Sequence, residues 1–233
     1  MAAVPELIAA CATFIALHLL ISGTAVRGAV TATVGEGPYL ALFSLASLGS
    51  MVWMSSAYAG LPPSENAFFW AAPDAWVWLG PPVNLIALVL VFLGVTTPNP
   101  TLAQMEFLLE RGDPAKGIVR VSRHPMLMGL LLWSLYHLAA NGDAASLTFF
   151  GTFALTTALG PRAIDAKRAR KMGDAWVPFA RKTSIIPFVA IAQGRNRFVP
   201  SEIGGARIAG GVLLFAGFFL AHGWLFGVPA TNW

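Results

Sequence analysis

The basic residues of this chain lie in only three of the segments between its apolar stretches, and this pattern constrains the fold more than any other feature. Arg27 follows the first apolar stretch, four basic residues precede Pro125, and the other ten lie between Arg162 and Arg207. If the apolar stretches span a membrane, these three segments are alternate loops on one side. Because Lys and Arg collect on the cytoplasmic side, both chain ends are predicted on the non-cytoplasmic side.

Six stretches are apolar enough to be candidates for membrane-spanning helices. The chain is 56% hydrophobic and only 11% charged, with a mean hydropathy of +0.66, whereas soluble domains carry about 25% charged residues. We therefore predict an all-α polytopic integral membrane helix bundle, forming one transmembrane domain in a bacterial inner membrane. The predicted spans are residues 5–26, 39–61, 75–95, 125–140, 144–160 and 205–227, and residues 161–204 form a basic cytoplasmic connection.

The basic net charge does not by itself indicate a nucleic-acid partner. The formal charge is +4, but membrane orientation and attraction to anionic lipid explain the same residues. The one cysteine, Cys11, excludes an internal disulfide. The sequence contains no Gly-rich nucleotide loop, no Cys-x-x-Cys-His motif for covalent cofactor attachment and no zinc signature.

Histidines within the apolar stretches are the strongest functional candidates, because a polar ring in a membrane helix is costly and usually functional. His18 lies about 14 Å, and His137 about 18 Å, from the predicted cytoplasmic ends of their helices. Two histidines at matching depth on different helices can sandwich a heme iron. Because the Cys-x-x-Cys-His motif is absent, such a heme would be noncovalent heme b. We predict His18 and His137 as the iron ligands, with His222 as an alternative to either; the competing interpretation is that each histidine bonds a neighbouring helix.

A second group of candidates lies at the cytoplasmic edge of the predicted spans. Arg27 or Arg123 would serve as a donor to heme propionates. His124 directly precedes Pro125 at a predicted helix start, where unpaired N–H groups attract anions. His124 and Arg123 are therefore candidate contacts for a propionate, phosphate or carboxylate. The alternative is a structural helix start, with Ser122 as its cap and Pro125 at its first position.

Several short motifs between about residues 14 and 197 form a combined pattern: His18, Ser22, Arg27, Arg123-His124-Pro125, Leu132-Trp133, His137-Leu138, Asn141-Gly142-Asp143, Ile164-Asp165, Gly173-Asp174, Trp176 and Thr183-Ser184. Together these motifs resemble the NnrU family, and within it the zeta-carotene isomerase branch. It implies a membrane heme b protein with His18 and His137 as ligands and Trp133 beside the cofactor. It also implies a redox-gated isomerase that acts on a cis double bond of a lipophilic, linear polyene, and it leaves room for a redox partner.

Two other functions stay open at this point. Other NnrU proteins are associated with denitrification, which implies a heme redox or nitric-oxide-related accessory protein without isomerase activity. A remoter likeness, carried by Arg123-His124-Pro125, Gly129 and Trp133, is to the isoprenylcysteine and phospholipid methyltransferases, which bind S-adenosylmethionine. The paired glutamates of that group are missing here, where the segment reads Ile164-Asp165-Ala166-Lys167.

Overall fold

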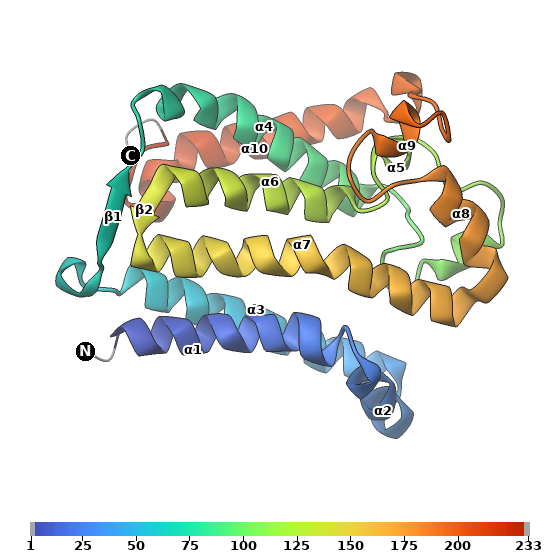
Figure 1. Ribbon diagram of the computed structural model, residues 1–233, viewed down its shortest axis with the longest axis horizontal. Helices are drawn as coiled ribbons and strands as arrows, with labels where there is room; N and C mark the ends of the chain where they lie inside the picture. The colour runs from blue at the N-terminus through green and yellow to red at the C-terminus, as the bar shows by residue number, and fades with distance from the viewer. Residues whose placement is uncertain (1–2, 231–233) are drawn as a thin grey trace. The chain divides into compact units, whose positions relative to one another are not determined.

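The computed structural model describes residues 3–230, and almost all of its regular structure is helical (Figure 1). The chain divides into two compact units, each built from two separate stretches of sequence. The first unit comprises the chain up to Pro73 together with His137–Ala163, and the second comprises Asp74–Tyr136 together with the chain from Ile164 onward. The histidine pair and the His124 region therefore belong to different units.

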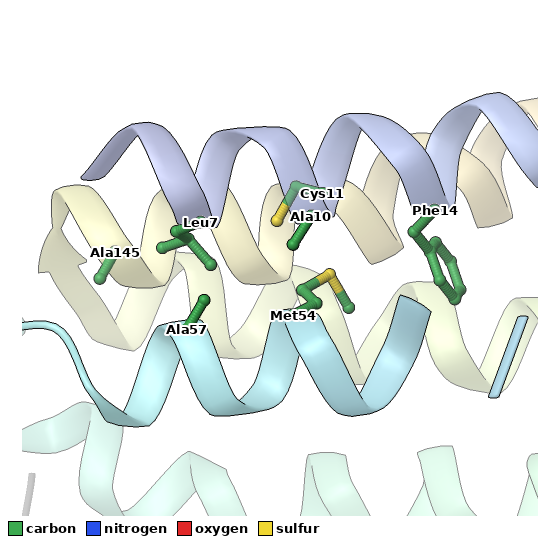
Figure 2. Close-up of a cluster of buried hydrophobic side chains, with 7 residues drawn as sticks. All are labelled: Leu7, Ala10, Cys11, Phe14, Met54, Ala57 and Ala145. Atoms are coloured by element: carbon green, nitrogen blue, oxygen red, sulfur yellow. The ribbon is translucent and has the colours of Figure 1, made fainter. Parts of the chain in front are cut away.

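The first unit is organised around helix α1 (Ala3–Ile15), which packs against α3 (Glu36–Ala59) and the start of α7 (Ala144–Met172). Apolar residues at helical spacing place one continuous face of α1 in this contact. Figure 2 shows α1 side chains facing the α3 residues Met54 and Ala57, and Met54 is fully buried. The buried cluster consists of Leu7, Ala10, Cys11, Phe14, Met54, Ala57 and Ala145.

Helix α1 does not continue to residue 26, so the predicted end of the first span is wrong. A π-helical turn, Ala16–Ile21, follows α1, and its widened ladder closes with the Ser22 amide donating to the Leu17 carbonyl at 3.0 Å. Helix α2 (Ala25–Val34) then begins, capped by the Thr24 hydroxyl, which accepts from the Val26 amide at 3.3 Å. Residues 22–24, which include the capping residue Thr24, therefore interrupt the helix within an otherwise apolar stretch.

A short antiparallel pair of strands joins the ends of two helices in the same unit. Strand β1 (Phe68–Ala71) pairs with β2 (Asn141–Asp143), and Trp70 lies opposite Gly142. A Cβ at Gly142 would lie 2.0 Å from the Trp70 carbonyl oxygen, so this pairing requires glycine. Asp143 accepts hydrogen bonds from the Ser146 amide and Asn66 Nδ2, at 2.9 and 2.8 Å, and so caps α7.

The second unit contains the closely packed helices α4 (Ala75–Thr96), α6 (Pro125–Ala140) and α10 (Gly205–Phe226), of which α4 and α10 lie side by side in Figure 1. Glycines on α10 and α6 allow close approach to α4. A separate buried cluster joins α4, α5 (Ile118–Val121) and α8 (Trp176–Lys182), and α9 (Val189–Ala192) follows. That cluster consists of Leu93, Ala115, Ile118, Val119, Val121, Trp176 and Phe179.

Among the described residues, four helical segments are long and apolar enough to cross a membrane: Val4–Ile21, Glu36–Ala59, Ala75–Thr96 and Gly205–Phe226. Long apolar helices therefore cover most of the predicted spans 39–61, 75–95 and 205–227. Helix α6 is apolar but shorter, and the predicted span 144–160 is the first part of α7, which continues through Pro161. The count of six spans and the side of the membrane on which the ends lie stay predictions.

Candidate functional site

His18 lies in the π-helical turn, where its ring is held by α1. Its Nδ1 donates to the carbonyl of Phe14 at 2.9 Å, and the ring stacks on Phe14 with centroids 4.1 Å apart. The edge of a second aromatic ring, Phe43 on α3, lies 5.4 Å away. Because a carbonyl only accepts, the proton of neutral His18 is on Nδ1 and the lone pair is on Nε2. Metal-binding histidines adopt this tautomer when a carbonyl accepts a hydrogen bond from the ring nitrogen that does not bind the metal.

His137 is buried near the end of α6, in the same unit as His18. Its ring stacks on Phe150 of α7 with centroids 4.7 Å apart. Phe150 contacts Phe149, Phe149 contacts Phe153, and Phe153 contacts Phe14, with centroid distances between 5.2 and 5.5 Å. These four phenylalanines, which we call the aromatic array, connect the two histidines through an unbroken series of ring contacts.

The packing of α1 against α7 sets the relative depth of the two histidines. Phe14 contacts Phe153. Further along both helices, a Cβ atom placed on Gly23 would lie 3.5 Å from the Cβ of Ala163. His18 therefore falls between these levels along α7, whereas His137 contacts Phe150. The backbone of His18 therefore lies about one helical turn or more, roughly 5 Å along α7, beyond the level of Phe150. The two imidazole rings are connected through the ring contacts of the aromatic array.

The chemistry of this region suits a heme. A histidine pair is a sufficient protein ligand set for heme iron, because the macrocycle supplies the other ligands. The flat apolar rings of the aromatic array are the kind of surface against which a porphyrin packs. Since a series of ring contacts through four phenylalanines separates the two histidines, ligation of one heme iron by both would require this part of the unit to rearrange. No group of three or more His, Cys, Asp or Glu placed to hold a metal ion occurs within residues 3–230.

The other predicted cofactor contacts are divided between the two units. Arg27, in the first unit, forms an ion pair with Glu36 and lies over the Tyr39 ring at 5.2 Å. Trp133 is half-buried on α6 in the second unit. His222, also in the second unit, donates from Nδ1 to the Val228 carbonyl at 2.6 Å. Neither His222 nor Trp133 belongs to the unit that holds His18 and His137.

Arg123 and His124 form a second polar centre with Asp165, a residue whose partners the sequence does not reveal. His124 Nε2 donates to one carboxylate oxygen at 2.8 Å, and Arg123 donates to the other from two nitrogens at 2.6 and 2.9 Å. The Asn99 side chain and the Thr101 hydroxyl donate to the Arg123 carbonyl at 2.8 and 3.1 Å. The Ser122 hydroxyl accepts from the His124 amide at 3.1 Å, as the predicted helix start requires.

Burial and neighbouring charge shift the pKa values of His124 and Asp165 in opposite directions. Burial lowers the pKa of His124 below its usual value, and the hydrogen bond and negative charge of Asp165 only partly offset this. Burial raises the pKa of Asp165, but the hydrogen bonds from His124 and Arg123, together with nearby positive charge, outweigh the effect of burial, and the net pKa is lowered. At neutral pH the centre therefore holds a charged carboxylate, a charged guanidinium and a neutral imidazole.

A small cavity of about 30 Å³ lies beside His124, lined by residues that include Gly94, Asn99, Thr101 and Ile164. This volume has room for a water molecule or two. Ligand pockets for small molecules are roughly 300–1,000 Å³, so the cavity is far too small for S-adenosylmethionine. The Asp165 carboxylate is also fully engaged by Arg123 and His124. The small cavity beside His124 therefore does not fit the cofactor of a methyltransferase.

The described residues form a helical protein in which four helical segments are long and apolar enough to cross a membrane. The chain belongs to the NnrU protein family, which matches residues 6–230. No solved structure matches the chain significantly.

Two curated relatives have an assigned activity. The chloroplast 15-cis-zeta-carotene isomerase of Arabidopsis thaliana is 30% identical over 80 residues, which are 34% of this chain and 22% of the isomerase. The Zea mays enzyme of the same name is 28% identical over 81 residues, 35% of this chain and 22% of the enzyme. The match thus spans less than a quarter of either relative.

Proposed function

We propose that this chain is an integral membrane protein that binds heme b through His18 and His137 and isomerises a cis double bond of a lipophilic, linear polyene. The observation that carries the proposal is the state of His18, whose Nδ1–H bond to the Phe14 carbonyl leaves Nε2 as a ligand nitrogen. The named activity of the two isomerase relatives supports the reaction class. The expected location is the bacterial cytoplasmic membrane, although both relatives are chloroplast proteins.

The chain's own residues would bind and orient both cofactor and substrate. The Phe14 carbonyl fixes the plane of the His18 ring, and Phe150 supports the ring of His137. The aromatic array offers flat, apolar surfaces to a conjugated chain and excludes water. Arg27 would exchange Glu36 for a heme propionate, an equally charged partner. When bound, the heme would supply an iron that changes oxidation state, while the isomerisation itself is redox-neutral.

Absorption spectroscopy of the purified full chain tests the heme. Protein produced with ample heme should show a Soret band with low-spin, bis-histidine features. His18→Ala and His137→Ala should each abolish or strongly shift that band. His222→Ala is the matched control and should leave it unchanged. A parent protein with no Soret absorbance contradicts heme binding, and loss of the band only in His222→Ala would reassign the ligand.

A separate assay tests the isomerase activity. Liposomes that contain the heme-loaded protein and 15-cis-zeta-carotene should convert the 15-cis isomer in the dark, faster under reducing than oxidising conditions. Chromatography of the extracted carotenoids measures the conversion. Heme-loaded protein that converts no polyene in either state would contradict the isomerase and favour a heme redox or nitric-oxide-related accessory role.

A further inference from the structure

An open groove of about 300 Å³ lies in the second unit, and its lining residues, which include Arg123, the neighbour of His124, differ from those around the small cavity beside His124. Its walls combine two arginines, Arg123 and Arg195, with the segment 183–186 and Val189. The volume is within the range of small-molecule sites. We call this feature the arginine groove. Its mixture of guanidinium and aliphatic groups suits an amphiphilic anion better than a purely polar or purely apolar ligand.

The two guanidinium groups meet at a single backbone oxygen. Arg123 and Arg195 both donate from Nη1 to the carbonyl of Thr183, at 3.1 and 2.9 Å. Asp165 neutralises Arg123. Arg195 has only neutral acceptors among the described residues, namely Gln193 and the carbonyls of Arg181 and Thr183. The groove therefore carries one uncompensated positive charge, and the planar guanidinium is the donor best matched to phosphate.

Exposed apolar side chains lie on the groove wall, at Ile186, and next to it in the chain, at Phe188. Ile186 is 64% exposed and Phe188 is 51% exposed. The Phe188 ring contacts the ring of Phe198, itself 48% exposed, with centroids 5.9 Å apart. Phe188 also adopts a left-handed backbone conformation with φ of 65°, which is unusual for a bulky residue. Its backbone is fixed by the amide donating to the Val121 carbonyl at 2.9 Å. Such strain is found mostly at functional sites.

The charge of the surrounding segment has one sign. Residues 175–201 contain no Asp or Glu, and their basic residues are Arg181, Lys182, Arg195 and Arg197. Lys182 pairs with Asp113 from another segment, at 2.9 Å. Basic clusters next to exposed aromatic and aliphatic side chains are typical of surfaces that contact the headgroup region of an anionic leaflet.

We propose that the arginine groove binds the phosphate group of an anionic phospholipid, with Arg195 at the phosphate and Ile186, Phe188 and Phe198 among the acyl chains. The site rests on the membrane location proposed above but is independent of heme and of isomerase activity. It places the segment 183–198 at the membrane surface, on the side where the basic residues collect.

Native mass spectrometry of the full chain in detergent, titrated with phosphatidylglycerol, tests the site. The parent protein should bind phosphatidylglycerol more tightly than phosphatidylcholine with the same acyl chains. Arg195→Gln should weaken phosphatidylglycerol binding about five- to tenfold, because a charge-assisted contact to phosphate is lost. Arg195→Lys should restore part of it. Arg170→Gln removes the same charge from an exposed arginine on the last turn of α7 and is the matched control, expected to change binding less than about twofold.

Three outcomes overturn the site. Equal weakening by Arg195→Gln and Arg170→Gln would indicate general surface attraction. Equal binding of phosphatidylcholine would remove the role of charge. Displacement of the lipid by a modest excess of inorganic phosphate would indicate a soluble-anion site. A Soret band measured on the same samples separates the phospholipid site from the heme proposal. Lipid binding that depends on Arg195 supports the phospholipid site even where the Soret band is absent. A Soret band without lipid binding that depends on Arg195 overturns the phospholipid site but not heme binding.

Discussion

Asp165 joins the start of α6 to α7 through two basic side chains that have little exposure to solvent. Replacing it as Asp165→Asn keeps the volume but removes the charge that balances Arg123, whose side chain is 13% exposed. Breaking a buried ion pair on one side costs about 3–5 kcal/mol, and we expect about 2–3 kcal/mol here because the carboxylate is 16% exposed. Thermal unfolding in detergent, followed by circular dichroism, should show a clearly lower Tm.

Asp174→Asn is the control for this substitution. Asp174 is exposed in the turn after α7, so its loss should change the unfolding free energy by less than about 0.5 kcal/mol. An Asp165→Asn protein as stable as the parent would show that the carboxylate makes no net contribution to folding.

His124 makes stability depend on pH in a predictable direction. The pKa of His124 is lowered in the folded protein, whereas in the unfolded chain it is about 6.5. Between these two pKa values the unfolded chain binds more protons than the folded protein. Stability should therefore be full above about pH 6.5 and fall as the pH is lowered through this window. His124→Gln should flatten the pH dependence of Tm between about pH 7 and 5, whereas His222→Gln should not. A parent protein with a constant Tm over this range would contradict the prediction.

Residue types alone identified several candidates but not their partners. His18, His137, Arg123 and His124 stand out because histidine and arginine are costly near a membrane interior. The pairing of Asp165 with His124 joins positions 41 residues apart, and no local spacing encodes a contact of that kind. The sequence likewise does not reveal that phenylalanines separate the two predicted ligands, since any apolar residue fits a membrane helix.

Helices α4 and α6 approach closely because Gly129 has no side chain. A Cβ at Gly129 would lie 2.5 Å from the Ala87 carbonyl and 2.9 Å from the Val91 amide nitrogen, both on α4. Gly129→Ala should destabilise the protein by about 1–3 kcal/mol through this overlap. Gly151→Ala, in α7 with open space around its Cβ position, should instead stabilise it by about 0.5–1 kcal/mol. Chemical denaturation in detergent measures both, and equal effects of the two would contradict the close packing.

At the level of elements, hydropathy and proline positions were enough to predict α3, α4 and α10 within a few residues, because long apolar helices are an unambiguous pattern. The π-helical turn at His18 was not predictable, since inserting one residue into a helical ladder leaves no compositional mark. The β1–β2 pair was missed for a related reason: Asn141-Gly142-Asp143 is a turn signal, and its strand pairing depends on Trp70, which lies far away in sequence.

At the scale of the whole molecule, the exposed surface agrees with the apolar composition. Trp78, Leu220 and Trp224 are each more than 80% exposed, and side chains of this kind face lipid rather than water when a helix spans a bilayer. We expect the protein to remain in the membrane fraction after carbonate and high-salt washing and to be released only by detergent. Release by carbonate would indicate a peripheral association and contradict integral insertion.

The orientation implied by the basic residues is testable with single cysteines, because native Cys11 is only 3% exposed and should label little. Ser64→Cys lies in the polar connection between α3 and β1, and Ala169→Cys lies in the basic part of α7. If Lys and Arg collect on the cytoplasmic side, a membrane-impermeant maleimide should label Ser64→Cys in intact cells and Ala169→Cys only after lysis. The parent chain gives the background, and the reverse pattern would invert the orientation and place the arginine groove on the opposite leaflet.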